Sequence, residues 1–189
     1  MLDIGTTLDI GDHRVEVTGN PESHTDRYVI RVDCDPGGPG IKGDFPHIHP
    51  NLIETFRCVS GEMLVRAGRQ VSELAVGEKV EVAQGQIHGF LNVGSDQLIV
   101  ESEVIFPGGY NPDHDLMLFA GVYDRLKKER PVNRKTGEPP TLQMAVLTHA
   151  YKESIKQPGV AGLIMPLLAG VGRLAGYRSG PFEPSQRRP

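Results

Sequence analysis

The chain has 189 residues, of which 38% are hydrophobic, enough to bury the core of one domain with an appendage. Its formal net charge is −4 with both signs interspersed, which predicts neither a nucleic-acid partner nor binding to an anionic membrane. The two cysteines, Cys34 and Cys58, lack the number and spacing of a disulfide framework or a zinc finger. Because the N-terminus has no apolar run, we expect a cytoplasmic protein.

The N-terminal part of the chain predicts short strands. Residues 13–18 alternate polar and apolar side chains, and residues 28–33 are rich in β-branched and aromatic types. Glycines and prolines crowd residues 35–40, which predicts a loop that leads into a histidine-rich segment. This loop is either a plain surface connection or one border of a pocket.

The histidine-rich segment places potential metal ligands at ordered intervals. His47 and His49 are two residues apart, so in an extended segment their side chains leave the same face. Pro50 and Asn51 then favour a turn, so we expect Glu54 to begin a new strand.

Short strands continue at even intervals after Glu54, which indicates an all-β sandwich or barrel. A glycine-centred turn at residues 60–62 predicts a hairpin. The further strands are expected at residues 70–74, 79–82, 88–92 and 98–106. Closure of such a barrel would bring His88 across the interior to His47, His49 and Glu54.

After residue 107 the spacing of apolar residues changes from the period of a strand to that of a helix. Residues 1–110 are therefore expected to form a β domain, and residues 111–189 a helical extension. One helix is expected from 111–113 to residue 130, and a second one around residues 142–150. The apolar run at 160–172 is shorter than the roughly 20 residues needed to cross a bilayer. We expect it to pack on the barrel or on a subunit partner, with a pocket lid and membrane contact as alternatives.

The spacing of the potential ligands resembles the two sequence motifs of the cupin superfamily. Four residues separate His49 from Glu54 and six separate Glu54 from Gly61, as in the first motif. The second motif is matched by four residues at the family's spacings: Gly77, Gly85, His88 and Asn92. The opening glycine is displaced, and Ala83 stands where the motif has proline. The resemblance covers roughly residues 28–106, with an interval between Gly61 and Gly77 similar to that of compact bacterial-type, single-domain members.

This resemblance implies a jelly-roll-like cupin β-barrel with one mononuclear metal site, held by His47, His49, Glu54 and His88. Three imidazoles and a carboxylate suit one divalent transition metal ion, for which Fe(II) is our first choice and Mn(II), Ni(II), Co(II) or Zn(II) are possible. The other histidines have no partner at ligand spacing and are expected in solvated roles: His13, His24, His114 and His149. Because cupins of this size commonly pair through sheet edges, the resemblance also implies a homodimer, which we expect here.

The alternation of side chains between the two faces of the motif strands predicts which residues line a substrate pocket. Phe56 and Cys58 share a face with Glu54, and Phe90 and Asn92 share one with His88. No lysine or arginine has this parity, which favours a small uncharged or weakly acidic organic substrate over a phosphorylated one.

Two functions remain open. The segment around Glu54 is similar to that of quercetin-dioxygenase-like cupins, a resemblance that implies a metal-dependent oxygenase or a related lyase or isomerase with Glu54 as ligand and proton acceptor. The alternative is a cupin that binds a metal or a small molecule without turnover.

Overall fold

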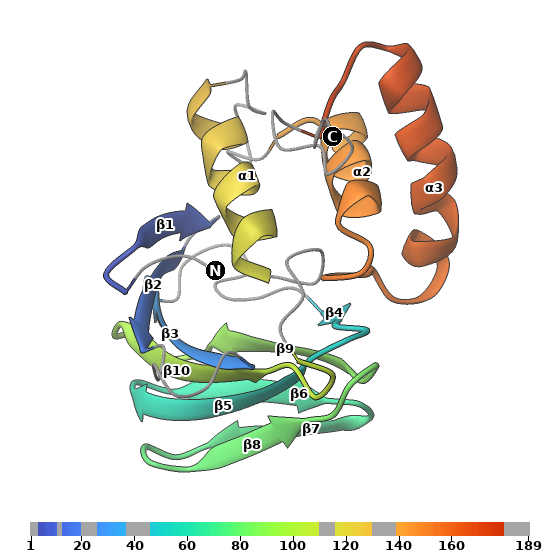
Figure 1. Ribbon diagram of the computed structural model, residues 1–189. Coiled ribbons are helices and arrows are strands. Elements are labelled where there is room, and N and C mark those ends of the chain that lie inside the picture. The colour runs from blue at the N-terminus through green and yellow to red at the C-terminus, as the bar shows by residue number, and fades with distance from the viewer. Residues whose placement is uncertain are drawn as a thin grey trace.

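The computed structural model describes residues 4–10, 13–19, 26–36, 46–109, 116–129 and 139–179. Within these residues, all strands precede all helices along the chain, and the helices lie together on one side of the strands (Figure 1). The strands are β1 (Thr7–Ile10), β2 (His13–Gly19), β3 (Arg27–Cys34), β4 (His47–Ile48), β5 (Ile53–Ser60), β6 (Met63–Ala67), β7 (Gln70–Leu74), β8 (Lys79–Val82), β9 (Ile87–Asn92) and β10 (Leu98–Ile105). The helices are α1 (Leu116–Glu129), α2 (Thr141–Ala150) and α3 (Gly159–Leu174).

The strands form two antiparallel sheets, which confirms the expected all-β, jelly-roll-like fold with a helical C-terminal part. One sheet has the order β1-β2-β3-β10-β5-β8, and the other has the order β4-β9-β6-β7. Strands β4 and β9 therefore belong to one sheet, and strands β5 and β10 belong to the other. Residues that are far apart in the sequence therefore face each other across the interior.

The hairpin predicted around residues 60–62 is wrong, because β5 and β6 belong to different sheets. The chain crosses from one sheet to the other at Gly61, whose φ is +89°. A Cβ atom at Gly61 would lie 2.8 Å from the Cα atom of Leu98. A glycine turn suits a hairpin and a crossing equally well, and here β5 is already paired with β8 and β10 on its two sides.

The core lies between the two sheets and follows the alternation of the strands. In β3 and β10 every second side chain is buried, as expected of strands with one face on a core. The largest fully buried apolar side chains include Tyr28, Phe56 and Phe106, and each such burial contributes about 1.5–3 kcal/mol. This packing fixes the faces of β5, β9 and β10, and therefore the direction of the polar side chains among them.

The helices add a second apolar cluster. Phe119, Tyr123 and Leu126 of α1 are buried against α2 residues that include Leu147, as the helical period predicted. Ala120 of α1 joins the core between the sheets. Residues 111–115, where the sequence predicted the start of α1, lie outside the described part of the chain.

Helix α3 packs on α2, and none of the described helices is long and apolar enough to cross a membrane. Ala169 and Gly172 are the buried residues of α3, so the two helix backbones approach closely. The apolar run that the sequence placed at residues 160–172 therefore has one side covered by a neighbouring helix of the same chain.

Gly172 provides a test of this close approach. A Cβ atom there would lie 2.7 Å from Val146 Cγ2 and 2.8 Å from the Leu142 carbonyl oxygen. We expect Gly172→Ala to lower the free energy of unfolding by roughly 1–3 kcal/mol, because α3 must move away from α2. The matched control is Gly121→Ala in α1, where the added Cβ meets open space. The control should stabilise the protein by roughly 0.5–1 kcal/mol in urea denaturation, and equal shifts for both variants would contradict the packing.

Candidate metal centre

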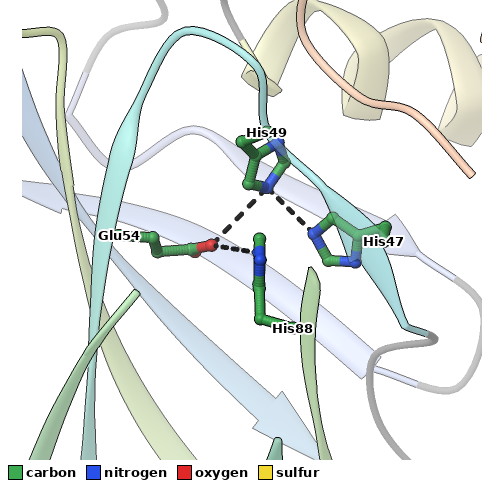
Figure 2. A group of neighbouring side chains, drawn as sticks. All are labelled: His47, His49, Glu54 and His88. Carbon is green, nitrogen blue, oxygen red and sulfur yellow. Dashed lines mark hydrogen bonds and ion pairs between the residues drawn. The ribbon is translucent and has the colours of Figure 1, made fainter. Parts of the chain in front are cut away.

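Four potential metal ligands converge from three strands and one turn (Figure 2). His47 of β4 is paired directly with His88 of β9 in the antiparallel register. His49 follows β4 immediately, and Glu54 is the second residue of β5. The turn and the new strand at Glu54 agree with the prediction from the sequence, and they carry the ligands of one short segment into both sheets.

The distances between the ligand atoms match the first coordination shell of one ion. The Nε2 atoms of His47 and His49 are 2.9 Å apart. Glu54 Oε2 lies 3.2 Å from His88 Nε2 and 3.5 Å from His49 Nε2, and the four ligand atoms all lie within 4.8 Å of one another. Ligands at about 2.1 Å from a metal are separated by about 3.0–3.5 Å when adjacent in octahedral or tetrahedral geometry. A single ion fits between these atoms.

The electrostatics of the cluster also fit a cation. Burial is the largest influence on Glu54 and by itself raises the pKa of its carboxyl, but His49 and His88 hold that pKa well below its usual value. Glu54 is therefore a buried carboxylate, only 4% exposed, and its Oε2 atom has no hydrogen-bond partner. An unsatisfied buried anionic oxygen that faces imidazole nitrogens is expected of an atom that coordinates a metal.

Hydrogen bonds behind the ligands orient them toward the centre. His88 Nδ1 donates to the Gln86 carbonyl oxygen at 2.8 Å, and His49 Nδ1 donates to the Ser154 carbonyl oxygen at 2.6 Å. Because a carbonyl oxygen only accepts, these bonds place the proton on Nδ1 and leave the Nε2 lone pair for a metal. On the carboxylate side, Ser102 Oγ of β10 donates to Glu54 Oε1 at 2.5 Å.

Sequence reasoning did not identify Ser102 or Ser154. Ser102 could have been found, since it shares inward parity with the apolar residues of β10 and is a buried polar side chain among them. Ser154 acts through its backbone carbonyl, which carries no signal of residue type.

The segment between α2 and α3 lies along β4, which carries His47 and is followed directly by His49. Ile48 of β4 exchanges two backbone hydrogen bonds with Lys156, at 2.9 and 2.8 Å. Asn51 Nδ2 donates to the Glu153 carbonyl oxygen at 3.0 Å. The helical extension therefore supports the metal centre directly, through backbone groups of residues 153–156.

Phe56 and Phe90 form an apolar side of the centre. The ring of Phe56 lies 5.9 Å from that of His88 and 5.3 Å from that of Phe90, measured between ring centroids. Both side chains are buried. Of the two aromatic residues that the sequence assigned to a substrate pocket, Phe56 is thus next to a potential metal ligand, and Phe90 packs on Phe56.

Cys58 and Asn92 are also buried, but their contacts are with backbone groups. Cys58 Sγ lies near the carbonyl oxygens of Ser60 and Gly61, and burial together with Glu78 raises the pKa of its thiol. Asn92 Nδ2 donates to the carbonyl oxygens of Asp35 and Asp96, and its Oδ1 accepts from the Gly94 amide. These contacts account for the burial of both residues without a substrate, so their role in a pocket stays a prediction.

The described histidines outside the motifs form no second cluster of potential ligands. Within the part of the chain that the structure describes, His47, His49, Glu54 and His88 are the group that can hold a metal ion. His149 lies on α2, where burial, Arg173 and Lys152 lower its pKa. His24 and His114 lie outside the described residues, as does the side chain of His13.

Several solved structures resemble parts of the chain. The cupin domain of Cnp3 from Schizosaccharomyces pombe is 12% identical with a TM-score of 0.45, and the match covers 53% of this chain and 64% of that chain. An RmlC-like cupin from Shewanella frigidimarina is 17% identical with a TM-score of 0.46, over 55% of this chain and 86% of that chain. A conserved protein with a double-stranded β-helix domain from Klebsiella pneumoniae is 25% identical with a TM-score of 0.44, over 54% and 84%.

A search of curated proteins finds no match to the chain. The family model described as "Cupin domain" matches residues 30–105. This range includes all four potential ligands and β4 to β10, which form the interior where the ligands meet. Residues 30–105 thus match the cupin domain model, which supports the cupin resemblance for this part of the chain.

Proposed function

We propose that the protein is a metal-dependent enzyme, an oxygenase or a related lyase or isomerase that acts on a small uncharged or weakly acidic organic substrate. The observation that carries the proposal is the convergence of three imidazole Nε2 atoms and the Oε2 atom of Glu54, which has no hydrogen-bond partner, on one buried point. A divalent first-row metal held by these four residues would supply Lewis acidity and could bind a small molecule beside the protein ligands. Fe(II) is favoured, with Mn(II), Ni(II), Co(II) and Zn(II) as alternatives.

The residues around the ligands would have separate roles in such an enzyme. Glu54 would serve as a ligand and as the proton acceptor for a substrate hydroxyl or carbon acid, while the hydrogen bond from Ser102 keeps Oε1 in place. The Nδ1 hydrogen bonds of His49 and His88 hold both rings in one tautomer and orientation. Phe56 and Phe90 exclude water from the side of His88.

The charges near the centre support an unphosphorylated substrate. Arg57, Arg66 and Lys79, which lie on strands of the two motifs, are all exposed rather than directed into the interior. A phosphate group would have no cation from these strands to bind. An apolar or weakly acidic molecule fits the aromatic side better.

The second candidate is a protein that binds metal without catalysis. It is favoured by the enclosure of the centre, because the exposed fractions of His47, His49, Glu54 and His88 lie between 1% and 4%. A closed site with every ligand supplied by the protein is typical of structural metals. Turnover therefore has to be measured separately from metal binding.

Metal content tests the common basis of both candidates. We expect about one divalent ion per chain by elemental analysis, and almost none after His49→Ala is combined with His88→Ala, since two of four ligands are lost. His149→Gln is the matched control, because this histidine lies outside the cluster. Metal content that is unchanged in the double variant would contradict the site.

Ser102→Ala tests the orientation of the carboxylate. Loss of the 2.5 Å hydrogen bond to Glu54 Oε1 should weaken metal affinity about 10–100-fold, the usual effect of removing a group that positions a ligand. Competition with a chromophoric chelator measures the affinity. Ser72→Ala on β7 is the control and should leave it unchanged, and equal affinities for both variants would remove Ser102 from the site.

Oxygen uptake tests the enzymatic proposal. Protein loaded anaerobically with Fe(II) should consume dioxygen in the presence of a flavonol, a diketone or a catechol, measured with an oxygen electrode. Glu54→Gln should keep part of the metal but lose uptake, because a neutral amide cannot accept the proton. Glu81→Gln, an exposed change on β8, is the control. No uptake with any of these classes, together with tight binding of another ligand, would favour the binding protein.

A further inference from the structure

The outer face of α3 is an exposed apolar stripe. Its members recur at the helical period along the whole helix and have large exposed fractions. They are Val160 (73%), Leu163 (81%), Ile164 (45%), Leu167 (71%), Val171 (46%) and Leu174 (91%). In Figure 1, α3 is the outermost of the three helices, with α2 between it and α1.

Helix α3 has no polar face opposite this stripe. Arg173 is the one charged residue between Gly159 and Leu174, and the opposite side of the helix packs on α2 through Ala169 and Gly172. A helix that is apolar all round is normally buried on all sides. The exposed area of the six side chains is roughly 700 Å², which exceeds the largest patch on a typical monomer and approaches the roughly 800 Å² that each partner buries in a stable complex.

We propose that a second copy of this chain covers the stripe, with the two α3 helices packed antiparallel about a two-fold axis at Leu167. A two-fold interface requires a surface that complements itself, so that residue i meets residue j and residue j meets residue i. Val160 and Leu174 lie seven residues before and after Leu167, and Leu163 and Val171 lie four residues before and after it. In an antiparallel pair, Val160 of one copy therefore meets Leu174 of the other copy, and Leu163 meets Val171.

The remaining member of the stripe fits the same axis. Ile164 lies three residues before Leu167, and its counterpart three residues after is Gly170. A Cβ atom built at Gly170 meets nothing within 4 Å, so there is open space beside the helix at this position. The large side chain of Ile164 from one copy would therefore pack over the open space at Gly170 of the other copy, twice per dimer.

The charge of α3 favours a protein partner over a lipid surface. Helices that lie on membranes carry lysines and arginines on a polar face opposite their apolar face. In α3 the opposite face is packed on α2, and Arg173 is the one cation of the helix.

Disulfide cross-linking tests the pairing and its direction in the full-length protein. Leu167→Cys lies on the axis and should form a disulfide-linked dimer under mild oxidation, whereas Val76→Cys, 63% exposed between β7 and β8, should not. The native Cys34 and Cys58 are fully buried, so the introduced thiol is the accessible one. Val160→Cys alone should stay unlinked, because its two copies would be about 20 Å apart. A mixture of Val160→Cys and Leu174→Cys proteins should give linked heterodimers.

Light scattering after gel filtration tests the interface without cross-links. The native protein should be a dimer, and Leu167→Asp should make it a monomer with an unchanged far-ultraviolet circular dichroism spectrum. The control Val76→Asp should remain a dimer. A native monomer, a dimer that survives Leu167→Asp, or efficient cross-linking of Val160→Cys alone would each overturn the proposal. Binding of a native monomer to phosphatidylserine vesicles would assign the stripe to a lipid surface instead.

Discussion

The burial of the Glu54 carboxylate is the constraint on which the rest of the site depends. Transfer of an ionised carboxylate from water into a protein interior costs several kcal/mol unless opposite charge and hydrogen bonds compensate. Ser102 satisfies one oxygen atom, while the other faces the Nε2 atoms of His49 and His88. A divalent cation between these atoms would compensate the charge completely, which explains why so polar a group lies within an otherwise apolar barrel.

The fold meets this constraint by joining two sheets at one point. Pairing of β4 with β9 brings His47 opposite His88, and pairing of β5 with β10 brings Glu54 close to Ser102. The cupin domain supplies every ligand, but the carbonyl that orients His49 belongs to Ser154, outside residues 30–105. The helical extension is thus part of the support of the metal centre as well as a separate apolar cluster. Changes in the extension can therefore affect metal binding through the backbone of residues 153–156.

Much of this arrangement could be predicted from the sequence, since it rests on parity and spacing. The two-residue interval of His47 and His49, and the turn-forming Pro50 and Asn51, placed the ligands correctly on strand and turn. The crossing at Gly61 could not be predicted, because whether a glycine turn joins paired strands depends on the partners that β5 finds elsewhere. The contact of Ser154 with His49 could not be predicted either, because any residue type can present a backbone carbonyl group. In the run at 160–172, Pro166 and several glycines lower the helix propensity, so the sequence contains only a weak helix signal. The small residues of this run are nevertheless needed for the close contact with α2.

The central claim is that one metal ion is bound by three Nε2 atoms and by Glu54 Oε2. Diffraction data from crystals of the purified protein, collected on both sides of the absorption edge of the metal found in it, test this most directly. We expect one anomalous peak per chain at about 2.0–2.2 Å from these four atoms, with further density in the remaining coordination positions. A peak bound through Nδ1 atoms, or metal located only elsewhere on the chain, would contradict the account.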